Sequence, residues 1–130
     1  MYVFVYGTLK HGFGLHALLE KGENRYRGWA YIDGLSLYDW GSCPAAFVQG
    51  GSRIWGEVYE VDDATLNRLD AVEAMYTRKE MTARITEGSV DLNPIQVGVY
   101  VSNLNPTGGV WIPDGVFRRD KPGCCTNYSI

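Results

Sequence analysis

The sequence predicts an α+β domain in which one strongly curled sheet forms a small barrel. Two observations lead to this fold class. Short runs that are apolar throughout, or that alternate apolar and polar residues, recur along the 130-residue chain between glycine- and proline-containing breaks. Helical spacing is found only around residues 15–20 and 64–75. Many strands with two helices in one small chain are typical of α+β architecture.

Composition and charge argue against several classes of function. A chain of 130 residues can bury one core, and we expect a single domain over residues 1–130. The net charge is −3 and the basic residues are scattered, so nothing indicates a nucleic-acid partner. No apolar run approaches the roughly 20 residues that a membrane span needs, and no signal peptide is expected. Cys43, Cys124 and Cys125 have no disulfide-framework spacing, which favours reduced thiols, no metal site and a cytoplasmic location.

The chain begins with a strand that runs into a glycine-containing turn. Residues 2–6 are apolar at both odd and even positions, as in a strand buried on both faces. Gly7 to Gly12 follow, and then a helix is expected around residues 15–20. A strand, a turn and a helix in this order present backbone N–H groups that can bind a carboxylate or phosphate. The segment lacks the Walker and dinucleotide-binding patterns, and a purely structural tight turn is the alternative.

Glycine pairs separate the strands of the middle region. We expect strands over residues 25–32, 35–40, 45–49, 54–59, 77–86 and 95–102. Asp33-Gly34 and Gly50-Gly51 are expected to be turns, the second of which returns the chain into the strand before the helix. In the last of these strands the valines alternate with other residues, so Tyr100 points away from the valine face. Residues 103–130 are expected to form a loop and then an irregular tail or an edge element.

The segment from Gly56 to Arg78 contains the most unusual candidate residue. Asp62-Asp63 ends its strand and offers carboxylates that can cap a helix over residues 64–75. One face of that helix carries Leu66, Leu69, Glu73 and Tyr76. A carboxylate on an apolar stripe loses hydration, which raises its pKa towards the range useful for proton transfer. The alternative is that Glu73 bends out to solvent or meets Arg78.

Tyr6-Gly7-Thr8-Leu9 directly follows the first strand. Further along the chain come Leu37–Gly41 with Pro44, the segments Gly56–Asp63 and Leu69–Glu73, then Tyr76–Arg78 and Tyr100. In this order and at these separations, the segments resemble the γ-glutamylcyclotransferase-like family, which includes γ-glutamylamine cyclotransferases and AIG2-like proteins, over about residues 1–102. The chain departs from the pattern at His11, where arginine is common, and at Ala74-Met75, which is shorter than the usual segment after the glutamate.

The resemblance implies a mixed β-barrel flanked by helices, with a pocket at one end, and an enzyme that needs no cofactor. Such enzymes close a γ-glutamyl unit into 5-oxoproline and release an amine. Carried over by position, Glu73 would be the catalytic acid/base, Tyr6, Gly7, Thr8 and Leu9 would hold the substrate's α-carboxylate, and Tyr100 would be either pocket wall or sheet packing. The implied partner is a small γ-glutamyl compound; the leaving amine and the oligomeric state are not specified. A non-catalytic binder of γ-glutamyl or related anionic metabolites is the alternative function.

Overall fold

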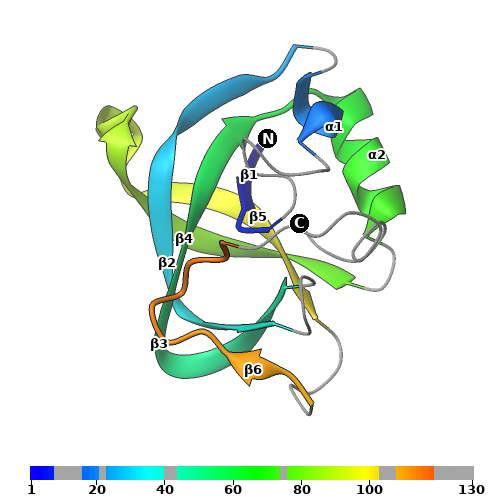
Figure 1. The fold of residues 1–130 in the computed structure, drawn as a ribbon. Helices are drawn as coiled ribbons and strands as arrows, with labels where there is room; N and C mark the ends of the chain where they lie inside the picture. Colours follow the sequence, from blue (N-terminus) through cyan, green and yellow to red (C-terminus); the bar gives the residue numbers. More distant parts are fainter. Residues whose placement is uncertain (8–15, 21–22, 40–43, 74–75, 103–107, 119–130) are drawn as a thin grey trace.

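The computed structural model describes residues 1–7, 16–20, 23–39, 44–73, 76–102 and 108–118 (Figure 1). Its elements are β1 (Tyr2–Val5), α1 (Ala17–Glu20), β2 (Arg25–Asp39), β3 (Pro44–Glu60), α2 (Asp63–Val72), β4 (Tyr76–Gly88), the 3-10 helix η1 (Val90–Leu92), β5 (Ile95–Ser102) and β6 (Val110–Trp111). The three cysteines, Cys43, Cys124 and Cys125, lie outside the described residues.

The strands form a closed ring of mixed direction. β1 pairs antiparallel with β3, β3 with β2, β2 with β4, and β4 with β5. β5 then returns to β1 in parallel, through Val3 with Gly98 and Phe4 with Val99, and this pairing closes the ring. α1 and α2 contact each other on one outer side of the ring (Figure 1). The predicted α+β class with a mixed, closed sheet and flanking helices is therefore confirmed.

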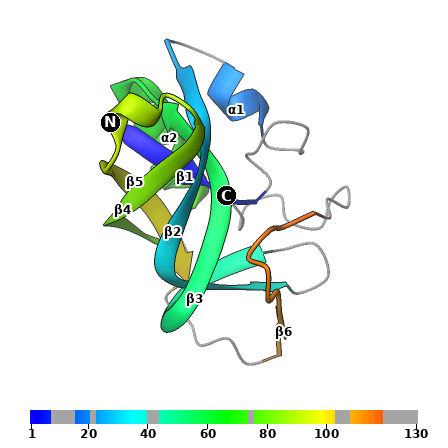
Figure 2. The same cartoon turned by 90° about the vertical axis from the view of Figure 1, so that its left-hand side faces the viewer.

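β2 and β3 are each one continuous strand, and this corrects two predicted turns. Asp33 pairs with Arg53, and Leu35 pairs with Val48. Between these two pairs, Gly34 on β2 and residues 49–52 on β3 have no partner in the register, and they lie opposite each other. Gly34 and Gly51 have positive φ angles of 91° and 82°, which glycine adopts without steric cost. Because the two irregularities face each other, they bend both strands together and reverse neither chain. The resulting curve of β2 and β3 is visible in Figure 2.

The described part of the tail packs against the ring. Val110–Trp111 forms β6 and pairs with the end of β2 at Tyr38 and Asp39, so the edge alternative holds for these two residues. Beyond β6, the Trp55 N–H donates to the Gly115 carbonyl at 2.9 Å. Phe117 is buried in the core of the ring. Residues 108–118 therefore pack against the ring, with β6 as an edge strand and irregular structure after it.

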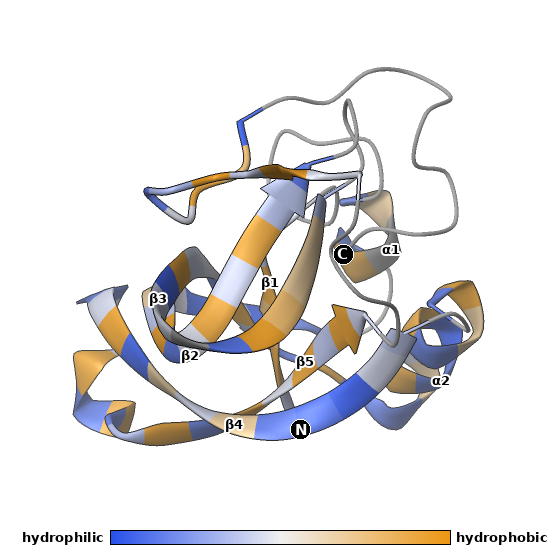
Figure 3. Ribbon diagram, turned by 90° about the horizontal axis from the view of Figure 1, so that it is seen from below, coloured by the Kyte–Doolittle hydropathy of each residue, from blue (hydrophilic) through white to orange (hydrophobic). Residues whose placement is uncertain are grey.

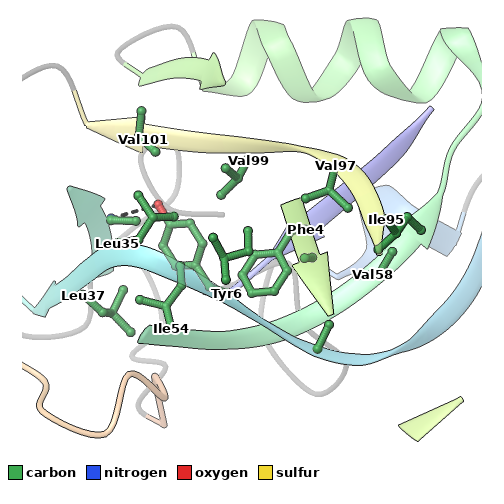
Figure 4. Close-up of a cluster of buried hydrophobic side chains, with 14 of the residues drawn as sticks. Phe4, Tyr6, Leu35, Leu37, Ile54, Val58, Ile95, Val97, Val99 and Val101 are labelled. Carbon is green, nitrogen blue, oxygen red and sulfur yellow. Dashed lines mark hydrogen bonds between the residues drawn. The ribbon is translucent and has the colours of Figure 1, made fainter. Parts of the chain in front are cut away.

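The described residues form two buried clusters. In the first, inside the ring, Figure 4 shows Phe4 and Tyr6 surrounded by aliphatic side chains from the other strands. The second lies between the ring and the helices and contains Val3, Val5, Leu19, Tyr59, Val61, Leu69 and Tyr100. Neighbouring residues of β1 and β5 enter different clusters, as the two-residue period of a strand requires. In other parts of the sheet, hydrophobic and hydrophilic residues alternate along the strand (Figure 3). Tyr100 and Val99 lie in different clusters, which confirms that Tyr100 points away from the valine face.

Gly56 allows β3 to pass close to β1. A Cβ at this position would lie 2.3 Å from the Val5 carbonyl oxygen and 2.9 Å from the Phe4 ring. Neither the Val5 backbone nor the buried Phe4 ring can move away from an added methyl group. We therefore expect Gly56→Ala to lower the free energy of unfolding by about 1–3 kcal/mol, measured by urea denaturation. Gly98→Ala is the control, since its Cβ would meet the movable Arg78 side chain at 3.1 Å. Equal losses in the two variants would contradict this explanation.

Candidate active site

α2 is fixed at its start by Asp62. The Asp62 carboxylate accepts hydrogen bonds from the Thr65 N–H at 2.7 Å and the Glu23 N–H at 2.8 Å. Bonds from Thr65 and Glu23 lower the pKa of Asp62 to about 2, so the cap remains ionised under ordinary conditions. Helix capping by Asp62 was predicted from the sequence and is confirmed.

The C-terminal end of α2 places Glu73 in the interior. Its N–H donates to the Leu69 carbonyl at 2.9 Å, which completes the last turn. The residue is only 1% exposed, and neither carboxylate oxygen has a hydrogen-bond partner among the described residues. Loss of hydration raises the pKa of Glu73 to about 8. The alternative in which Glu73 turns out to solvent or pairs with Arg78 is excluded, because Arg78 instead pairs with Asp70 at 3.2 Å.

Three tyrosines lie within electrostatic reach of Glu73. Burial raises the pKa of Tyr6, Tyr76 and Tyr100, and the charge of Glu73 adds to the rise in each case. Tyr76 was expected on the helical stripe with Leu66, but α2 ends at Val72 and Tyr76 is the first residue of β4. It nevertheless packs against the same cluster as Leu66 and Leu69. These three hydroxyls near Glu73 therefore stay neutral at physiological pH.

The Tyr6 hydroxyl is held within the ring of strands. It donates to the Tyr100 carbonyl at 2.7 Å and accepts from the Ala46 N–H at 3.1 Å. Gly7, which follows it, is buried. The other predicted residues of the anion-binding turn, Thr8 and Leu9, lie outside the described residues, as does His11. The structure thus brings Tyr6 and Tyr100 together and sets both near Glu73.

Sequence reasoning missed one polar residue of this region, Asp70. The Tyr100 hydroxyl donates to Asp70 Oδ1 at 2.5 Å, and Arg78 Nε lies 3.2 Å from the same oxygen. Asp70 therefore joins α2, β4 and β5 one helical turn before Glu73. One signal in the sequence could have identified Asp70: it lies three residues before Glu73, and residues three apart on a helix lie on the same side.

The comparison with known proteins agrees with this geometry. The family model described as Gamma-glutamyl cyclotransferase, AIG2-like, matches residues 3–119. The chain belongs to this family. The match extends past residue 102, where the resemblance in the sequence ended, and includes the tail segment that packs against β2 and β3.

Individual members of the γ-glutamylcyclotransferase family show the range of similarity. The Gamma-glutamylcyclotransferase family protein YtfP of Escherichia coli (strain K12) is 40% identical over 72 residues, which cover 55% of this chain and 61% of that protein. The Gamma-glutamylaminecyclotransferase of Bos taurus is 35% identical over 122 residues, covering 85% and 71%. The solution NMR structure of Escherichia coli ytfP superposes with a TM-score of 0.66 at 29% identity, covering 90% of this chain and 96% of the other. The sequence matches to the bacterial relatives from Vibrio cholerae and Escherichia coli thus span about 60% of their length.

In the present protein, the Tyr6 hydroxyl joins two buried backbone groups. Tyr6→Phe would leave the Ala46 N–H and the Tyr100 carbonyl without this partner, so we expect a loss of about 1–3 kcal/mol in the free energy of unfolding. Tyr38→Phe is the matched control, because the Tyr38 hydroxyl makes an exposed contact with Gln49 at 3.4 Å. Urea denaturation should show a clear loss for Tyr6→Phe and little change for Tyr38→Phe. A Tyr6→Phe protein as stable as the parent would refute the bridging role.

The described residues of the present protein contain neither a candidate metal site nor a candidate membrane-spanning helix. Within those ranges, no group of three or more histidine, cysteine, aspartate or glutamate side chains is placed to hold a metal ion. In the same part of the chain, no helix has the length and apolar character needed to cross a membrane.

Proposed function

We propose that this protein is a cyclotransferase that converts a small γ-glutamyl amine or amino-acid conjugate into 5-oxoproline and the free amine. The observation that carries the proposal is the state of Glu73, a buried carboxylate without hydrogen-bond partners among the described residues and with a pKa of about 8. Burying such a group is costly unless it has a task, and a pKa near neutrality suits proton transfer. Family membership and the name of the Bos taurus relative support the same chemistry.

Glu73 would move a proton between the two nitrogen atoms of the substrate. At neutral pH the substrate's α-amine is an ammonium group and cannot attack. Ionised Glu73 accepts one of its protons, and the freed nitrogen forms a bond to the γ-carbonyl carbon. As the tetrahedral intermediate collapses, the bond to the leaving nitrogen breaks; that nitrogen receives the proton from Glu73 and a second proton from the attacking nitrogen. Proton exchange costs least when the two groups have similar pKa values, and the rise in the pKa of Glu73 to about 8 brings it much closer to an ammonium group than an ordinary carboxylate is.

The binding site would supply the remaining acceleration by holding the glutamyl chain folded. The ring closes within one molecule, and effective molarities for well-oriented reactions of this kind reach about 10⁵–10⁸ M. We assign the substrate's α-carboxylate to the turn from Tyr6 to Leu9. Since the Tyr6 hydroxyl is already bonded to Tyr100 and Ala46, the turn would act through its backbone N–H groups. Tyr100, whose hydroxyl is held by Asp70, would form a wall beside Glu73.

A panel of γ-glutamyl compounds tests the proposal. The purified protein is incubated with γ-glutamyl amines and γ-glutamyl amino acids, and 5-oxoproline is measured by mass spectrometry. The matching α-glutamyl isomers serve as controls, because their amide cannot be expelled by the same ring closure. We expect 5-oxoproline from at least one γ-glutamyl compound above the rate without protein. Binding of such a compound with no release from any of them would contradict the enzyme and support the alternative, a binding protein for γ-glutamyl or related anionic metabolites.

A further inference from the structure

A cavity lies on the outside of the ring, beside α1. It has a volume of about 410 Å³, and its described walls are His16, Tyr26, Glu57 and Tyr59. The strand register explains this grouping. Tyr26 of β2 pairs directly with Tyr59 of β3, and Glu57 is two residues before Tyr59 and so lies on the same face of the strand. His16 immediately precedes α1, which lies near the first residues of β2 in Figure 2.

The three rings form one continuous aromatic wall with Tyr59 in the middle. The Tyr59 ring centroid is 5.4 Å from that of Tyr26 at an interplanar angle of 57°, and 5.8 Å from that of His16 at 55°. The Tyr59 hydroxyl donates to Glu57 Oε1 at 3.0 Å and thereby fixes the carboxylate beside the rings. Tilted aromatic faces next to a carboxylate are the groups that recognise ammonium ions in proteins.

The charges around this cavity have the sign that a cation requires. Burial raises the pKa of Tyr26, and Glu57 and Glu87 raise it further. Burial also raises the pKa of Tyr59, with additional contributions from Glu57 and Glu20. Arg27, on the neighbouring part of β2, is bonded to Glu60, so its charge is offset locally. Both rings therefore lie in the negative field of nearby carboxylates, which favours a positive charge beside them.

We propose that this cavity binds a small organic cation with a primary or quaternary ammonium group. The ammonium would lie over the ring faces of Tyr26 and Tyr59, with Glu57 as its counter-ion. A volume of about 410 Å³ falls within the usual range for small-molecule sites, about 300–1,000 Å³. A free amine and the second, unacylated amino group of a γ-glutamyl diamine conjugate present the same ammonium chemistry to these groups, and the experiment distinguishes the two sources.

The test compares choline with 3,3-dimethylbutan-1-ol, a neutral molecule of nearly the same shape. Both are titrated into the full chain by calorimetry at constant ionic strength, with sodium chloride replacing choline chloride. We expect choline to bind at least about tenfold more tightly, the order expected for a cation on aromatic faces. Tyr26→Ala and Glu57→Gln should each weaken choline binding about tenfold, whereas Tyr26→Phe, which keeps the ring, should retain it. Tyr31→Ala is the matched control on the same strand, because the Tyr31 ring is covered by Arg53 at 3.8 Å and lies outside this cavity.

Two results would overturn the proposal: equal affinity for choline and the alcohol, or choline binding that survives both Tyr26→Ala and Glu57→Gln. The source of the ammonium is then tested with a γ-glutamyl diamine conjugate, whose second amino group remains an ammonium. If choline competes with this conjugate, the cavity receives the unacylated amino group of the substrate; if choline binds without competing, the cavity receives a free amine. Calorimetry does not require turnover, so the cation site stands or falls independently of the cyclotransferase proposal.

Discussion

Replacing Glu73 with glutamine is expected to lower the rate of 5-oxoproline release at least about a hundredfold, the lower end of what a lost general base costs. Glutamine preserves the shape of the side chain but cannot accept a proton from the substrate's ammonium group. Burying a neutral amide costs no more than burying an ionised carboxylate, so the fold should survive and the melting temperature should hold or rise. Affinity for 5-oxoproline should change little, because its carboxylate is assigned to the turn from Gly7 to Leu9.

Initial rates measured by mass spectrometry decide this prediction. Glu80→Gln is the matched control, since Glu80 is an exposed carboxylate on β4, and its rate should stay within about twofold of the parent. Equal rates for the Glu73→Gln variant and the parent would show that Glu73 is not the base. If both proteins bind a γ-glutamyl compound and neither releases 5-oxoproline, the protein is a binding module.

The second large effect is on stability as a function of pH. The pKa of Glu73 rises from an ordinary value of 4.5 to about 8 in the folded protein. Between these pH values the folded state retains a proton that the unfolded chain has released. The stabilising contribution of protonated Glu73 is therefore complete below about pH 4.5 and is lost as the pH rises to about 8. One pKa unit corresponds to about 1.4 kcal/mol, so the full loss is roughly 5 kcal/mol.

Urea denaturation of the parent and the Glu73→Gln variant from pH 5 to 9 isolates this contribution. Other groups, such as Asp62 with its lowered pKa, titrate in both proteins and cancel in the difference. The stability advantage of the variant should grow by about 1.4 kcal/mol per pH unit up to about pH 8 and then level off. Parallel stability curves across the whole range would contradict the raised pKa.

The features that the sequence predicted correctly depend on local patterns. The capping of α2 by Asp62 follows from a short polar side chain next to free N–H groups. The burial of Glu73 follows from the three- and four-residue spacing that places it with Leu66 and Leu69. The direction of Tyr100, away from the valine face, follows from the alternation along β5. Each of these features depends on residues that are close together in the sequence.

The features that the sequence did not predict depend on contacts between distant segments. Gly34 and Gly51 look like turns in isolation, and only the pairing of β2 with β3 shows that they face each other and bend one hairpin. Asp70 acquires its role from Tyr100 and Arg78 on two other strands. The partners of the Tyr6 hydroxyl lie 40 and 94 residues further along the chain. Local propensity carries no information about such partners.

The most direct test of the account is the titration of Glu73 itself. Carboxyl ¹³C NMR of the parent protein, with the Glu73 resonance assigned by its disappearance in the Glu73→Gln variant, reports the pKa of this one group. We expect a midpoint at about pH 8, with the carboxyl protonated through the weakly acidic range. A midpoint below pH 4 would show a carboxylate stabilised by partners or water, and would remove the basis for Glu73 as the proton acceptor.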